Sequence, residues 1–141
     1  MPELKFKHTY WAIFVAALAY FLLGAAWFSS LWKPWMEGTG LTMEWLTGHA
    51  AFNPAVPYVI AFAADFVIGF ALSCAIQLTG PLTAARGVKV AFLLWLGFVF
   101  TTWATEYVFE ERSIMTLAIV GGYPLIGMVV EGAIIGAWKK K

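Results

Sequence analysis

The chain has 141 residues, of which 62% are hydrophobic and only 12% are charged, whereas about 25% of the residues of a soluble domain are charged. A water-soluble fold could not cover so much apolar surface, which excludes the soluble globular classes. The net charge of +1 lacks the clustered cationic excess that phosphate neutralisation requires, so no nucleic-acid partner is predicted. The single cysteine, Cys74, cannot form an intrachain disulfide.

Four apolar segments are long enough to cross the membrane as helices, because a helix of about 20 residues spans roughly 30 Å of hydrocarbon. They cover about 10–28, 56–78, 88–109 and 113–138. Their length and lack of alternation exclude strands. The first segment exceeds the apolar region of a secretory signal peptide and no A-x-A cleavage pattern follows it, so we expect it to be retained. The sequence predicts one all-α integral membrane domain, a four-transmembrane-helix bundle of two antiparallel hairpins.

The cationic residues indicate the orientation of these spans. Seven of the nine flank one side of the predicted membrane, while Lys33 and Arg112 lie on the other side. By the positive-inside rule, both termini and the loop between the second and third spans are cytoplasmic, and 31–55 is an external loop. We expect a multi-pass protein of the bacterial plasma (inner) membrane. The seven residues are Lys5, Lys7, Arg86, Lys89, Lys139, Lys140 and Lys141.

Tryptophans gather near the predicted membrane boundaries, with four of them between positions 27 and 45. Indole rings favour the level of the lipid headgroups, so we interpret these residues as membrane anchors. An aromatic cage for a cation is the alternative interpretation. A short helix over 42–48 is expected to lie flat at the outer surface. The predicted anchors are Trp27, Trp32, Trp35, Trp45 and Trp138.

Small and polar residues recur at helical spacing on three spans, and the third span contributes Gly97, Thr101 and Thr105. In lipid, helices associate through close packing and polar contacts, so such faces should meet in the interior or at a subunit contact. The second span carries a stripe with a period of four residues, made of Ala61, Asp65, Gly69, Ser73 and Gln77, and the fourth carries a G-x-x-x-G pair. The residues predicted to pack at these faces are Gly69, Ser73, Gly132 and Gly136.

The fourth span also contains a proline about eleven residues from its start. Pro124 has no backbone N–H and its ring clashes with the preceding turn, so it should kink the helix and leave the carbonyl of Val120 without its donor. The adjacent Gly121 and Gly122 make such a bend easier.

Three acidic residues lie at different depths of the predicted membrane, where an ionisable side chain is costly and indicates function. If they share one interior, they could relay protons in a transporter. The alternative is that Asp65 and Glu131 are neutral hydrogen-bond donors that join helices, while Glu106 reaches the headgroups. The intramembrane polar candidates are Asp65, Gln77, Glu106 and Glu131.

No sequence motif of an enzyme is present: there is no nucleophile elbow, phosphate loop or dinucleotide fingerprint. No second histidine or cysteine accompanies His49 at a ligand spacing, so neither a metal site nor a cofactor is predicted. The first hypothesis is a non-enzymatic structural or accessory subunit in contact with membrane lipid, as a homo-oligomer or part of a larger membrane complex. The alternative is a small proton-coupled transporter using Asp65 and Glu131. A third is a lipid-modifying enzyme acting through Glu110, Glu111 and His49.

Three stretches of the sequence resemble the bacterial membrane proteins of the domain of unknown function 1761 family: "ALAYFLLGAAWFSSLWKPWMEGTGLT", "FLLWLGFVFTTWATEYVFEERS" and "GGYPLIGMVVEGAIIGAW". The family pattern has F-E-G-R after the third span, where this chain has Glu111 in place of the glycine. It also has a Gly-Tyr-His-like step where Pro124 follows Tyr123, and commonly an apolar residue at the position of Glu131. The resemblance implies a four-helix integral membrane protein without an established biochemical role. The departure at Glu131 argues against a proton relay as an activity of the whole family.

Overall fold

The computed structural model describes residues 6–7, 9–42, 44 and 55–138, and within them all regular secondary structure is helical. Four helices are long and apolar enough to cross a membrane: Tyr10–Ser30, Ala55–Thr79, Ala84–Phe109 and Ile114–Ala137. Their ends lie close to those of the four predicted spans. The prediction of an all-α membrane protein is therefore confirmed at the level of fold class.

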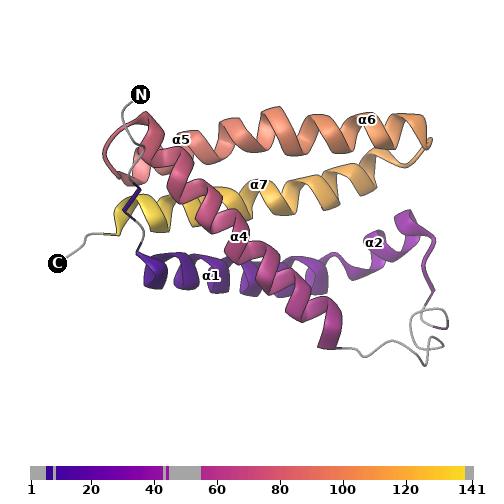
Figure 1. The fold of residues 1–141 in the computed structure, drawn as a ribbon. Coiled ribbons are helices and arrows are strands. Elements are labelled where there is room, and N and C mark those ends of the chain that lie inside the picture. The colour runs from indigo at the N-terminus through magenta and orange to yellow at the C-terminus, as the bar shows by residue number, and fades with distance from the viewer. Residues whose placement is uncertain (1–5, 8, 43, 45–54, 139–141) are drawn as a thin grey trace.

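The first two long helices are α1 (Tyr10–Ser30) and α4 (Ala55–Thr79), and the last is α7 (Ile114–Ala137). The third comprises α5 (Ala84–Leu94), the π-helix η1 (Trp95–Phe100) and α6 (Thr101–Phe109), while the short α2 (Trp32–Thr39) follows α1. In Figure 1, α7 runs between α1 and the α5–α6 helix, and α4 crosses them obliquely. α7 contacts every other helix named here, which makes it the centre of the structure.

Glycines permit the close contact between α7 and the start of α5. A Cβ atom added at Gly132 would overlap the backbone of Gly87, and one at Gly136 would overlap the backbone of Thr83. In lipid such close backbone approach favours dispersion contacts, since apolar burial provides no driving force between helices. The G-x-x-x-G pair therefore packs within the chain, against α5. A Cβ at Gly97, in contrast, would meet no atom within 4 Å.

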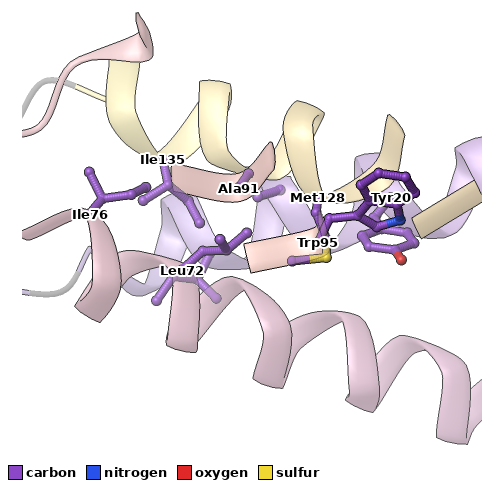
Figure 2. Packing of buried hydrophobic residues seen from close by; sticks show 9 residues of the cluster. Tyr20, Leu72, Ile76, Ala91, Trp95, Met128 and Ile135 are labelled. Atoms are coloured by element: carbon purple, nitrogen blue, oxygen red, sulfur yellow. The ribbon is translucent and has the colours of Figure 1, made fainter. Parts of the chain in front are cut away.

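A core of mostly apolar side chains joins the four long helices (Figure 2). It includes Ile13 near the start of α1, Ile76 near the end of α4 and Ile135 near the end of α7. The first six residues of α4, Ala55–Ile60, are all exposed, so α4 packs chiefly through its later turns. The core consists of Ile13, Ala16, Tyr20, Leu72, Ile76, Ala91, Trp95, Met128 and Ile135.

The turn between α6 and α7 places a non-glycine residue in the left-handed conformation. The N–H of Arg112 donates to the carbonyl of Tyr107 and that of Glu111 to the carbonyl of Val108, the bonding of a Schellman motif. Glu111 has a φ of 53°, the left-handed conformation in which a non-glycine residue costs about 1–2 kcal/mol. Glycine would adopt that conformation without the steric penalty.

The structure differs from the sequence-based prediction in three local respects. The segment predicted as loop from residue 31 starts with the helix α2, which ends at Gly40 with a φ of 71°. α5 begins at Ala84, because the Thr83 side chain caps it by accepting the N–H of Arg86. The third span contains the π-helix η1 where a regular helix was predicted, while Pro124 lies inside α7, within the predicted fourth span. The predicted helix over 42–48 and the anchor Trp45 lie outside the described residues.

The glycine contact predicts that valine is tolerated very differently at two positions. In Gly132→Val the side chain would press on the backbone of Gly87, so we expect the free energy of unfolding to fall by about 2 kcal/mol or more, at the upper end of overpacking costs. Gly97→Val is the matched control: its side chain would face open space, so the free energy of unfolding should fall much less. Unfolding in mixed detergent micelles, followed by tryptophan fluorescence, measures both. Equal losses in the two variants would contradict the contact.

Candidate functional site: an interior carboxyl pair

Asp65 on α4 and Glu131 on α7 bring two carboxyl groups into the interior of the molecule. Gly69, one turn after Asp65, provides the space, because a Cβ atom at Gly69 would lie 3.5 and 3.6 Å from the two carboxyl oxygens of Glu131. The four-residue spacing places Asp65 and Gly69 on one face of α4. The polar stripe predicted on the second span therefore faces the glutamate of the fourth.

Both carboxyl groups are buried and incompletely satisfied. The exposed fraction is 0% for Glu131 and 5% for Asp65. Within the described part of the chain, both oxygens of Glu131 and Oδ2 of Asp65 have no hydrogen-bond partner, and the two groups interact electrostatically. A buried ionised carboxylate without a partner costs several kcal/mol. The pair must therefore be neutralised by bound protons or by a cation. Among the described residues there is no cluster of three metal-ligating side chains.

Two tyrosines lie next to the pair, and each fills the space over a glycine of the opposite helix. Tyr20 of α1 covers Gly127 of α7, and Tyr123 of α7 covers Gly24 of α1. Their rings meet edge to face, with centroids 4.9 Å apart, and the Tyr123 hydroxyl donates to the carbonyl of Tyr20 at 3.3 Å. Both tyrosines interact electrostatically with Asp65 and Glu131. Figure 2 shows Tyr20 beside Met128 and Trp95.

The sequence analysis did not single out these tyrosines. Their signal is a repeated Tyr-x-x-x-Gly spacing, in "YFLLG" of α1 and "YPLIG" of α7. The pairing of residues 20 with 127 and 24 with 123 shows that the two helices run in opposite directions at this contact.

The stripe on α4 continues from the carboxyl pair to one end of the molecule. Nε2 of Gln77 donates to the carbonyl and the hydroxyl oxygen of Ser73, at 3.0 and 3.2 Å, and Oε1 of Gln77 accepts the N–H of Lys7 at 2.8 Å. Gln77 lines a cavity of about 1010 Å³ that is also bordered by Thr9, Thr83 and Gly136. The polar side chains of α4 thus extend from Asp65 toward this cavity.

A second cavity lies at the other end of the stripe. It has a volume of about 600 Å³ and includes Ala61, which precedes Asp65 by one turn of α4. Tyr123 borders this cavity and also interacts with both carboxyl groups, so it connects the cavity wall to the pair. The other aromatic residues of the wall are Phe21, Phe28, Trp32 and Tyr58.

Comparison with known proteins identifies the family of the chain. The profile of the family described as "Protein of unknown function (DUF1761)" matches residues 11–136, nearly the whole chain. The chain belongs to the DUF1761 family. No curated protein and no solved structure matches it.

In this DUF1761 protein, Glu106 does not join the other two intramembrane acids. Glu106 is exposed on α6, as are its neighbours Thr101 and Thr105. The hydroxyl groups of these threonines donate to the carbonyls of Gly97 and Thr101, each four residues earlier, so they are satisfied within their own helix. The interior that the sequence suggested for three acids therefore holds two, Asp65 and Glu131.

Two tryptophans donate hydrogen bonds to α7 on either side of the carbonyl that Pro124 leaves without a donor. The indole N–H of Trp27 donates to the carbonyl of Ile119 at 3.0 Å, and that of Trp95 to the carbonyl of Gly121 at 2.8 Å. Trp27, predicted as an anchor, therefore takes part in helix packing. Trp95, buried at the start of η1, was not singled out by the sequence.

Of the remaining predicted anchors that the structure describes, Trp32 and Trp35 lie on α2 and Trp138 follows the last residue of α7. The rings of Trp32 and Trp35 are 5.4 Å apart, and Trp35 also meets Phe28 edge to face. Trp32 and Trp138 are exposed, while Trp35 is half-buried. These positions suit contact with lipid headgroups.

The bond from Trp95 predicts a different response from two tryptophans of the same span. Trp95→Phe removes the donor to Gly121 and should lower the free energy of unfolding by about 1 kcal/mol, the usual net value of a hydrogen bond, plus a contribution from lost packing. Trp103→Phe, at an exposed site on α6, is the control, and it should lower the free energy of unfolding by less than half as much. Chemical denaturation in micelles, monitored by circular dichroism, compares them. A larger loss from Trp103→Phe would refute the assignment.

Proposed function

We propose that the chain crosses the plasma membrane of a bacterium four times, as two antiparallel helical hairpins with both termini in the cytoplasm. The positions of the charges support this topology. Lys7 lies at the end of α4 through its bond to Gln77, and Arg86 and Lys89 lie on α5 just after that end. The opposite end carries Glu110 paired with Arg112, where the cationic excess is absent.

This topology predicts the side of the membrane at which each end is found. Reporter domains fused to the N-terminus and to the C-terminus should both report a cytoplasmic location, because the cationic residues resist translocation. A fusion after Arg112 should report the opposite side. Two termini on different sides of the membrane would refute the proposal.

We further propose that the protein is a small proton-coupled carrier that uses the Asp65–Glu131 pair. The observation that supports this function is the complete burial of Glu131, with both oxygens unpartnered, beside a second carboxyl group on another helix. Structural carboxyl groups in lipid are normally paired with one another or with backbone. Carboxyl oxygens that have no hydrogen-bond partner among the described residues can bind an exchangeable proton or a cation.

The arrangement of the helices around the pair fits alternate access from two sides. The first cavity ends at Gln77, whose side chain is bonded to Ser73, and the second ends at Ala61 and Tyr123, with Ala61 one turn of α4 before Asp65. Between the cavities, α4 touches α7 at Gly69 and Glu131. Binding of a proton would remove charge from this contact, which lowers the cost of shifting α4 against α7. The coupled solute would pass along the same face of α4.

The carrier predicts that proton flux depends on the interior pair and not on the exposed acid. In proteoliposomes with an imposed potassium diffusion potential, Asp65→Asn and Glu131→Gln should each reduce proton uptake at least tenfold, because each removes a proton-exchanging group. Glu106→Gln removes the same charge from an exposed position and serves as the matched control. Unchanged flux in Asp65→Asn would end the carrier proposal.

The non-enzymatic accessory subunit is the second candidate, and the surface of the third span favours it. Of the four candidate spans, Ala84–Phe109 is the least buried. Phe98, with 71% of its surface exposed, and Leu93 lie on faces that lipid, a second copy or a partner subunit could cover. Absence of proton flux, together with a partner protein retained in stoichiometric amount after mild detergent extraction, would favour this function over the carrier.

A further inference from the structure

A third hollow, separate from the carboxyl pair, lies where α4 ends and α5 begins. Its volume is about 370 Å³. Thr79 contributes from the end of α4, and the other lining residues belong to α5 or to the residue that caps it. They are Thr83, Ala85, Arg86, Lys89, Val90 and Leu93.

One end of this hollow is cationic. The Arg86 guanidinium is held in place by a hydrogen bond to the carbonyl of Pro81 and by contact with Gly80, and Lys89 follows three residues later on the same side of α5. None of the described residues that line the hollow is acidic. Within the described chain, neither Arg86 nor Lys89 forms an ion pair, since the ion pair found there joins Arg112 to Glu110. Two positive charges are therefore available to a bound anion.

The other end of the hollow is apolar. Val90 and Leu93 lie one and two turns beyond Arg86 along α5, and seven residues of helix correspond to about 10 Å. Because α5 starts one of the candidate spans, this distance leads from the membrane boundary toward the hydrocarbon. The lining thus changes from cationic to apolar in the same direction as a phospholipid changes from headgroup to acyl chain.

We propose that this hollow binds one anionic phospholipid. Arg86 and Lys89 contact its phosphate and charged headgroup, and an acyl chain lies along Val90 and Leu93. Arginine presents a planar set of donors that matches phosphate, and basic pockets between membrane helices favour anionic headgroups. The site needs neither proton transport nor the Asp65–Glu131 pair, so its test is independent of the proposed function.

Titration of the purified full chain in nonionic detergent tests the site, with phosphatidylglycerol and phosphatidylcholine of identical acyl chains as probes and native mass spectrometry as the readout. The wild type should bind one phosphatidylglycerol at least tenfold more tightly than phosphatidylcholine. The double variant Arg86→Gln/Lys89→Gln should lose that preference. Lys33→Gln/Arg112→Gln removes the same charge from the opposite end of the molecule and should keep it. Arg86→Lys, which retains the charge but not the planar donor set, should weaken binding several-fold.

Three results would overturn the proposal. Equal losses in the two double variants would show a response to net charge alone. Equal binding of the two lipids would show that the headgroup is not recognised. Equally tight binding of glycerol phosphate, which has no acyl chains, would show an anion site rather than a lipid site. If the Arg86 variant does not fold, Lys89→Gln alone, at an exposed side chain, should still reduce the preference measurably, and an unchanged preference would count against the site.

Discussion

The close approach of the other helices to α7 depends on glycines, and the rest of the structure follows from this constraint. Gly132 and Gly136 admit the backbone of α5, Gly127 admits the ring of Tyr20, and Gly69 of α4 leaves space for Glu131. At the start of α7 the glycine lies on the neighbouring helix, because Gly38 of α2 leaves space for the side chain of Thr116. In lipid the contacts between helices gain little from apolar burial, so the dispersion contacts that such close approach permits must supply the attraction.

The same constraint explains why so many interior contacts are aromatic or polar. Where one helix lacks a side chain, a large group from its neighbour fills the space, as the two tyrosines do over Gly24 and Gly127. Buried indole N–H groups need acceptors. Trp27 and Trp95 find them in carbonyls of the turn that Pro124 loosens. A proline that would weaken an isolated helix is therefore accommodated, because helices on two sides donate to the neighbouring carbonyls.

Features with a strong local period were predictable from the sequence, and those that depend on tertiary placement were not. The stripe of Asp65, Gly69 and Ser73 was found because its spacing equals one helical turn and a carboxyl group facing lipid is costly. The outward placement of Glu106 was one of two alternatives, and the sequence could not decide between them, since threonines bonded to their own helix can face outward without penalty. Likewise the indole of Trp27 suits a headgroup or a buried carbonyl equally well, and only the position of α7 decides between them. The π-helix η1 breaks the period on which the prediction relied.

The packing of the helices does not depend on the presence of the carboxyl pair. Within the described chain neither carboxyl oxygen of Glu131 has a hydrogen-bond partner, so the packing of α4 on α7 gains no hydrogen bond from this group. An apolar side chain could fill the space over Gly69 without the desolvation cost of an unpartnered carboxyl group. The glycine and tyrosine contacts would be unaffected, since they involve other turns of α1 and α7. Glu131 therefore adds a desolvation cost that these helix contacts do not offset.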